Sequence, residues 1–344
     1  MGIFYGLQEL KATFALTIAC SSGWQLFKGN PIQETHLTNE LILWTGFAVT
    51  LGIMFILDLG VFNRKSHEIS FREAASWTSV WVTLALVFNI GVYYELGREK
   101  ALEFLAGYLI EQSLSVDNLF VFIMIFSYFH ISNKYQPKIL KWGIIGALVL
   151  RALFIVAGID LIERFSWTIY LFGGILVVTG IKMGFGKDEQ LEPEKNLAVR
   201  IIRRFMPITK RIRNDKFFIR RGSMIAATPL FLALVVIESS DVIFAIDSIP
   251  AVLSVTRDPL IVYTSNAFAI MGLRSMYYLL ANVMGMFAYL KLGVSFILAF
   301  VGVKMLLTHT QFKIPIHISL GVIFGVLMIS VLASIIITRG KASL

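Results

Sequence analysis

Runs of about twenty apolar residues recur along the chain, and each is long enough to cross the hydrocarbon core of a bilayer as a helix. Lipid offers the backbone no hydrogen-bond partners, so such segments are expected to be helical. The pattern predicts an all-α, polytopic membrane protein with about nine transmembrane helices. The predicted spans are 40–61, 75–96, 104–129, 139–161, 167–186, 225–254, 260–281, 288–308 and 316–338. The third and sixth exceed a minimal span, so we expect tilt or a local break in them.

Composition agrees with this class of protein. Of 344 residues, 57% are hydrophobic and 15% are charged, and the mean hydropathy is +0.75. The single cysteine, Cys20, excludes a disulfide framework and disfavours a thiolate metal site. No resident cofactor is implied. The net charge of +9 comes from Lys and Arg clustered in loops, so we expect the lipid bilayer, and not nucleic acid, as their partner.

Alternate loops differ in their Lys and Arg content, and this difference sets the expected orientation. The region 187–222 carries eleven basic residues against five acidic ones, whereas the loop between the fourth and fifth spans has one basic residue. The positive-inside rule therefore places the N-terminus outside and the C-terminus inside a bacterial inner (plasma) membrane.

Three regions are expected from these patterns. Residues 1–38 are predicted to be an N-terminal extracytoplasmic or interfacial segment, and 39–338 the transmembrane domain. The basic stretch 187–222, called here the basic loop, lies within that domain on the cytosolic side. It contains an amphipathic pattern that predicts a helix on the inner leaflet, with docking of a protein partner as the alternative. The apolar face is Leu197, Ile201 and Phe205, the basic face is Arg200, Arg203 and Arg204, and Pro207 should end the helix.

Two predicted spans carry acidic and amide residues that a lipid-embedded helix normally excludes. A carboxylate at the centre of a membrane helix costs roughly 2.5–3.5 kcal/mol on insertion scales. Several of them together therefore indicate a polar pathway or an ion site inside the membrane. The candidate metal residues are Glu111, Asp117 and Asn118 in the third span and Glu238, Asp241 and Asp247 in the sixth.

The same two spans open two copies of a repeat, 103–186 and 224–308. In each copy a carboxylate precedes an Asp by six residues, and a small polar residue follows that Asp. Further anchors in the same order are Arg151 with Lys182, 31 residues apart, and Arg274 with Lys304, 30 residues apart. Each copy holds three spans, an odd number, so the second must enter the membrane from the opposite side. The pattern predicts a 3+3 inverted repeat with a site at the repeat interface.

The candidate ligands are oxygen atoms alone, and none of the five histidines lies in either motif. Such a site suits Mg²⁺, Mn²⁺ or Ca²⁺ better than zinc or copper. Because residues six apart differ by about 120° around a helix, Asp241 and Asp247 cannot bind one ion from one regular helix. Pro250 should bend the helix and free the carbonyl of Ile246 as another ligand. Carboxylates at membrane depth can also carry protons, so proton-coupled antiport is chemically reasonable.

Other polar residues are candidates for the pathway or for gating. They are Asp58, Ser115, Ser240, Ser248, Arg151 and Arg274. In the alternative, structural interpretation, the acids pair with Arg151, Arg274, Lys182 and Lys304 to hold the helices together. Buried ion pairs are weak stabilisers, and the acidic pattern is duplicated, so an ion pathway is favoured. Asp58, near the inner end of the first span, is equally a pathway acid or an interfacial residue.

Four segments carry a resemblance to a known family. In order, they are YLIEQSLSVDNLFVF, ESSDVIFAIDSIPA, TSNAFAIMGLRSMYYLL and VGVKML, and between about residues 40 and 338 the chain resembles the TerC/Alx family of integral membrane proteins. That family is associated with tellurium resistance and manganese efflux and belongs among the LysE-like exporters. The resemblance implies Mn²⁺ as the transported ion and the same six residues as its pathway. The residues alone indicate only a hard divalent cation.

These observations predict a secondary exporter of Mn²⁺ or a similar cation, coupled to protons, and not an enzyme. One alternative is a membrane partner for the metalation or assembly of exported proteins, docking at the basic loop. A remote third interpretation is an intramembrane aspartic protease. It lacks support, because the Gly-x-Gly-Asp element of such proteases precedes neither Asp117 nor Asp247.

Overall fold

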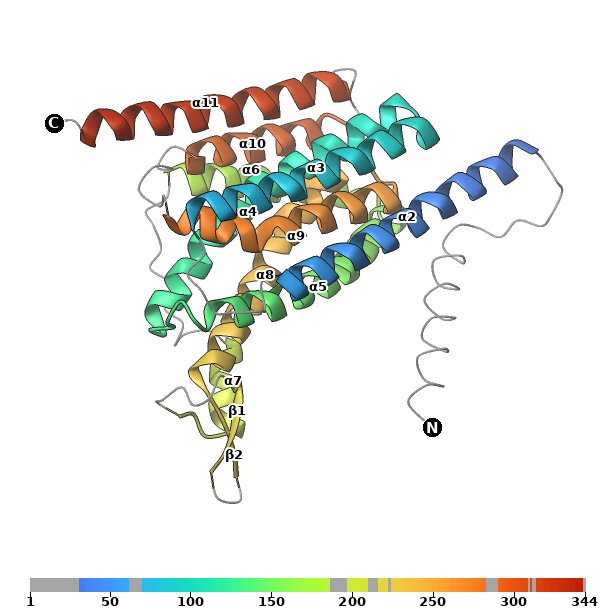
Figure 1. The fold of residues 1–344 in the computed structure, drawn as a ribbon. Helices are drawn as coiled ribbons and strands as arrows, with labels where there is room; N and C mark the ends of the chain where they lie inside the picture. Colours follow the sequence, from blue (N-terminus) through green and yellow to red (C-terminus); the bar gives the residue numbers. More distant parts are fainter. Residues whose placement is uncertain are drawn as a thin grey trace, which may run out of the picture. The chain divides into compact units, whose positions relative to one another are not determined.

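The fold is helical in the computed structural model, which describes residues 31–61, 70–185, 197–209, 216–221, 224–282, 290–308, 310 and 314–342 (Figure 1). Two compact units divide the chain, Met1–Ile42 and Leu43–Leu344. Most of the predicted segment 1–38 lies outside the described residues, which begin with the first turns of α2. The helices are α2 (Pro31–Val61), α3 (Phe71–Leu96), α4 (Arg98–Tyr128), α5 (Gln136–Arg164), α6 (Thr168–Phe185), α7 (Leu197–Phe205), α8 (Pro229–Leu253), α9 (Pro259–Asn282), α10 (Leu290–Leu306) and α11 (Ile316–Ala342).

Local sequence signals fix several helix ends. Ser70 caps α3, because its hydroxyl accepts a hydrogen bond from the Glu73 N–H at 3.3 Å. Gly97 separates α3 from α4 with a φ of 89°, a conformation that residues with a side chain rarely adopt. Pro229 opens α8 in the first turn, where a missing N–H costs nothing.

Seven helices in the described part of the chain are long and apolar enough to cross a membrane. They are α2, α3, α4, α5, α6, α8 and α11, and they confirm the all-α, polytopic class. α10 has only 17 residues. α9 carries Thr264, Asn266 and Arg274, which lower its hydropathy. The count of nine spans therefore stays a prediction.

The sixth predicted span began too early, and either tilt or a local break was expected in it. Residues 225–227 belong to strand β2 (Met224–Ala227), which pairs with β1 (Phe218–Arg221) as an antiparallel hairpin. From Pro229, α8 is helical without a break to Leu253, so the local break expected in this run is wrong. Pro250 lies in the last turn of α8 and lacks the N–H that would pair with the carbonyl of Ile246, so a role for that carbonyl as a ligand stays a prediction.

The amphipathic helix predicted in the basic loop exists as α7, and the chain leaves it at Met206, just before Pro207. The face that packs on the protein is not the apolar face expected to lie on the inner leaflet. Val199 is 1% exposed and packs in the core, whereas Ile201 is 48% and Phe205 is 80% exposed. The side chain of Leu197 lies outside the described part. α7 therefore packs on the protein through Val199, while Ile201 and Phe205 remain exposed, and contact of this face with the leaflet stays a prediction.

The helices of the two predicted repeats pack against one another. α4 and α5 each contact both α8 and α9, and α6 runs alongside α10 (Figure 1). Exchanging α4, α5 and α6 for α8, α9 and α10 leaves this set of pairings unchanged. The repeat and its inverted sense stay predictions from the sequence.

Glycines allow α6 and α10 to approach closely. A Cβ at Gly173 would lie 3.1 Å from the carbonyl oxygen of Gly302, and a Cβ at Gly302 would lie 2.8 Å from that of Gly173. A Cβ at Gly180 would be 2.7 Å from the carbonyl oxygen of Ser295. Small residues at such contacts let two membrane helices pack backbone against backbone.

Candidate functional site

A buried arginine lies at the meeting point of four helices. Arg151 of α5, which is 1% exposed, forms ion pairs with Glu111 of α4 and with Asp241 of α8. Its Nη2 is 3.8 Å from Asp241 Oδ1. Its Nη1 also donates a hydrogen bond of 2.9 Å to Asn266 Oδ1 of α9. We call Arg151, Glu111, Asp241 and Asn266 the Arg151 cluster.

The orientation of Asn266 is fixed by its own helix. Its Nδ2 donates to the carbonyl of Val262 at 2.9 Å, which leaves Oδ1 to face Arg151. One guanidinium stands against two carboxylates, so the charges do not balance and formally one negative charge remains. Buried charges persist only when they are paired and hydrogen-bonded, because removing them from water is costly. The Arg151 cluster therefore has unused capacity for positive charge.

Several buried oxygen atoms in the Arg151 cluster and elsewhere on α4 and α8 are not used. Glu111 Oε2, Ser115 Oγ, Asp241 Oδ2 and Ser248 Oγ have no hydrogen-bond partner among the described residues. Buried polar atoms are normally satisfied, so oxygens of this kind are available to a ligand or to water. Carboxylate and hydroxyl oxygens are ligands that hard divalent cations prefer.

Two of the predicted acids lie outside this cluster. Asp247 Oδ1 accepts a hydrogen bond of 3.0 Å from the Thr179 hydroxyl of α6. Glu238 places its carboxylate against Gly146 of α5, where a Cβ would overlap its oxygens. Both acids are half-buried. The contact between Glu238 and α5 exists only because residue 146 has no side chain.

The remaining predicted residues have varied surroundings. Asn118 and Arg274 are buried, and the Ser240 hydroxyl donates to the carbonyl of Val236 at 2.8 Å. Asp58 and Asp117 belong to α2 and α4, and their side chains lie outside the described part.

Among the described side chains, no group of three or more His, Cys, Asp or Glu residues is placed to hold a metal ion. The structure thus brings Glu111 and Asp241 together around Arg151, and the six-residue metal site stays a prediction.

The sequence reasoning missed two residues of the site: Asn266, which accepts a hydrogen bond from Arg151, and Thr179, which donates one to Asp247. Each is a polar residue inside an otherwise apolar segment, and that was the available signal. Asn266 even lies within one of the segments that carry the family resemblance. Their partners could not be assigned, because the sequence does not show which faces of α6 and α9 meet α8 and α5.

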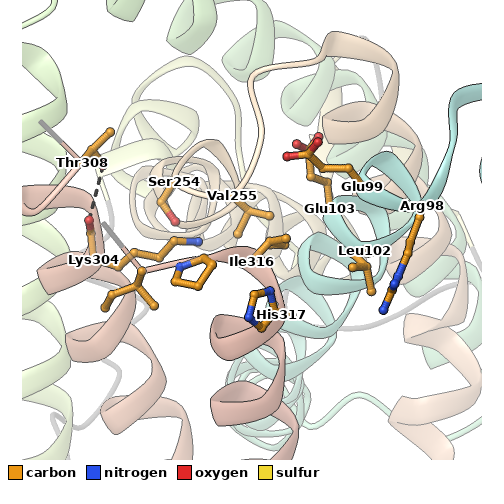
Figure 2. A pocket seen from close by; sticks show the side chains of 12 residues that line it. Arg98, Glu99, Leu102, Glu103, Ser254, Val255, Lys304, Thr308, Ile316 and His317 are labelled. Carbon is orange, nitrogen blue, oxygen red and sulfur yellow. Dashed lines mark hydrogen bonds between the residues drawn. The ribbon is translucent and has the colours of Figure 1, made fainter. Parts of the chain in front are cut away.

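An open cavity of about 860 Å³ lies where α4 begins and where α8 and α10 end. Figure 2 shows the carboxylates of Glu99 and Glu103 close together at one side of it, with Lys304 and His317 also lining the space. Beside it, Lys100 forms ion pairs with Glu103 at 2.9 Å and with Asp258 at 3.2 Å. This cavity gives one end of the bundle a charged opening.

A line of small and polar positions on α4 joins this cavity to the Arg151 cluster. Glu103, Gly107 and Glu111 follow one another at intervals of four residues, so they share a helix face, and the first and last are about 12 Å apart along the axis. A Cβ at Gly107 would lie 2.9 Å from Ser265 Oγ and 3.3 Å from Val252 Cγ1. Side chains from α8 and α9 therefore reach the backbone of α4 between the two glutamates.

Comparison with known proteins agrees with this architecture. The family model described as "Integral membrane protein TerC family" matches residues 96–342, which include every residue of the Arg151 cluster. The chain belongs to the TerC family. It is therefore an integral, multi-pass membrane protein, and the match covers both predicted repeats while leaving out α2 and α3.

Relatives of this TerC-family chain match over most of their length. A membrane protein of Myxococcus xanthus is 48% identical over 297 residues, which are 86% of this chain and 93% of that protein. A Salmonella typhi protein named "Putative membrane-bound redox modulator Alx" is 48% identical over 298 residues, 84% of this chain and 92% of its own. The Escherichia coli K12 protein of the same name is 46% identical over 298 residues, with the same coverage. No solved structure matches the chain significantly.

Proposed function

We propose that this TerC-family protein is a secondary transporter that exports Mn²⁺ or a similar hard divalent cation through the polar centre of its helix bundle. The Arg151 cluster is the observation that supports this function. Glu111 and Asp241 come from the two predicted repeats, and both are buried at one point between α4, α5, α8 and α9. A purely structural pair would need one carboxylate for one arginine, and here a second carboxylate and several free oxygens are present.

The other candidate acids extend this centre into a pathway. Glu238 lies nine residues after the start of α8, and Asp247 lies six residues before its end. Both are half-buried, whereas Asp241 is buried. Cation passage would involve these acids in turn, with Asp117 and Asn118 as their counterparts on α4. Protons would occupy the same carboxylates on the return step, which is how coupling to the proton gradient would arise.

The positive-inside rule supports an inner-membrane protein with its N-terminus outside and its C-terminus inside. In that orientation the cavity lined by Glu99, Glu103 and Lys304 opens to the extracytoplasmic side and serves as the exit. The protein would be a transporter without a resident cofactor, not an enzyme. The exposed Ile201 and Phe205 of α7, next to basic residues, favour contact of the basic loop with the anionic inner leaflet.

Inside-out membrane vesicles test this function, because export from the cell becomes uptake into the vesicle. Vesicles with the parent protein should accumulate Mn²⁺ when acidified inside, and Asp117→Asn and Asp247→Asn should each lower the initial rate about tenfold or more. Asp160→Asn is the matched control, because Asp160 is 53% exposed and pairs only with Arg164 four residues away in the described structure. If both folded variants carry Mn²⁺ as fast as the parent, the site assignment is wrong.

A second candidate function is a partner for metalation or assembly of exported proteins, with the exposed apolar and basic face of α7 as its docking surface. Two named relatives are called redox modulators. Thiol–disulfide exchange within this chain would require two cysteines, and it has only Cys20. A redox effect would therefore follow from the cation that the protein moves. Deleting 187–222 distinguishes transport from the partner function. Unchanged Mn²⁺ flux together with lost partner binding would favour the partner function.

A further inference from the structure

Arg151 occupies the place where a transported cation would meet the two buried carboxylates. Its guanidinium lies between Glu111 of α4 and Asp241 of α8, and all three side chains are almost completely buried. A divalent cation that binds these carboxylates would come within a few ångströms of the guanidinium. Two positive charges at such a separation in a low-dielectric interior repel each other strongly. The cation and the guanidinium therefore cannot both stay between the two acids.

The contacts of Arg151 differ from those of a rigid structural ion pair. A structural pair would be expected to hold one carboxylate with two parallel hydrogen bonds. Here the guanidinium spreads its contacts over three partners, its distance to Asp241 is 3.8 Å, and its Nε has no hydrogen-bond partner among the described residues. Glu111 and Asp241 each keep one oxygen that Arg151 does not satisfy. The contact with Asp241 is long enough to be exchanged, whereas the contact with Glu111 is close and leaves the second oxygen of Glu111 to a cation.

Asn266 offers the guanidinium a neutral position to move toward. Its Oδ1 already accepts from Arg151 Nη1 at 2.9 Å, and its Nδ2 is held by the carbonyl of Val262. An amide oxygen can keep a guanidinium hydrogen-bonded without competing with a metal for charge. The displaced side chain would thus remain satisfied while the two carboxylates bind the cation.

Resting on the proposed function, we propose that Arg151 is a tethered competitor for the transported divalent cation. In the unloaded protein the guanidinium balances Glu111 and Asp241, and an arriving cation displaces it toward Asn266. When the guanidinium returns, it helps to expel the cation, so Arg151 weakens binding and speeds release. Arg151 therefore sets the affinity for the cation and the rate of turnover. In either state, the carboxylates of Glu111 and Asp241 have a positive charge beside them.

Mn²⁺ transport by the purified protein in proteoliposomes tests this role through separate KM and kcat values. Arg151→Met should lower the KM for Mn²⁺ about tenfold and lower kcat by a similar factor, because nothing competes with the cation or expels it. Arg151→Lys keeps a buried positive charge and should return KM toward the parent value. Arg164→Met removes an exposed arginine of the same helix, which pairs with Asp160 at 2.7 Å, and should leave KM unchanged.

A rise in KM for folded Arg151→Met would overturn the inference, because Arg151 would then be orienting the carboxylates instead of competing for them. An equal fall in KM for Arg164→Met would also overturn it. If Arg151→Met does not fold, Asn266→Leu tests the inference instead. Removing the amide acceptor should raise the KM for Mn²⁺ about tenfold. An unchanged KM would contradict the displacement of Arg151 toward Asn266. A parent protein that carries no Mn²⁺ at all refutes the proposed function, which is a different result from an unchanged KM.

Discussion

Glu111 of α4 and Arg151 of α5 form an ion pair inside the helix bundle in which neither side chain is more than 1% exposed. Removing one partner of such a pair leaves a buried charge uncompensated, which typically costs about 3–5 kcal/mol. We expect Arg151→Met to lower the free energy of unfolding by that amount, and Glu111→Gln to lower it less, because Asp241 still pairs with Arg151. The double variant should lose less than the sum, with a coupling of about 0.5–3 kcal/mol. Denaturant unfolding in detergent measures the stability of the two single variants and of the double variant.

The exposed pair of Arg164 and Asp160 is the control for this cycle. Its side chains are 70% and 53% exposed, and its N–O distance is 2.7 Å. An exposed pair contributes about 0–1 kcal/mol, so Arg164→Met should change stability by no more than that. Additive losses for Glu111→Gln and Arg151→Met would show that the two residues are not coupled.

Gly146 makes room for the carboxylate of Glu238, so Gly146→Ala should displace that carboxylate. We expect the variant to lower Mn²⁺ transport several-fold, since Glu238 can no longer lie in the same place. Gly174→Ala is the matched control, because a Cβ at Gly174 meets no atom within 4 Å. In a helix interior, replacing Gly by Ala should raise the stability of the protein by up to about 1 kcal/mol, and transport should be unchanged. Equal transport by both variants would mean that the position of Glu238 does not matter.

Thr179 donates the hydrogen bond that the structure gives to Asp247, at 3.0 Å. Thr179→Val keeps the shape of the side chain and removes the donor. Hydrogen bonds to charged groups contribute about 1.5–3 kcal/mol, so we expect a loss of stability in that range and a lower transport rate. Thr179→Ser retains the hydroxyl and should behave like the parent in flux and in thermal unfolding. A Val variant with parent-like flux would show that Asp247 acts without this contact.

The sequence predicted the helices well, because the signals that produce them are local. Apolar length marks the runs of α3, α5 and α11, and Ser70, Gly97 and Pro229 mark helix ends through their own backbone chemistry. The hairpin β1–β2 was missed. Its second strand, MIAA, is apolar and reads as a continuation of α8. The pairing with β1 and Pro229 at the start of α8 separate it from the helix.

The candidate site was predicted in its residues and only partly in its contacts. Buried acids in an apolar run are visible from their cost in lipid, so Glu111 and Asp241 were found. The sequence also raised the possibility that acids pair with Arg151. It could not show that one arginine serves both acids, or that Asn266 completes the cluster. Those contacts depend on how α5 and α9 rotate against their neighbours, which is decided by packing over the whole bundle.

Mn²⁺ uptake by proteoliposomes that contain only the purified protein tests cation transport most directly. With an acidic interior, the parent protein should load Mn²⁺ well above protein-free liposomes, and Asp241→Asn should fall close to that background. An excess of Mg²⁺ or Ca²⁺ outside would show how selective the pathway is among hard cations. Uptake by the parent protein no faster than by protein-free liposomes would contradict the transporter function.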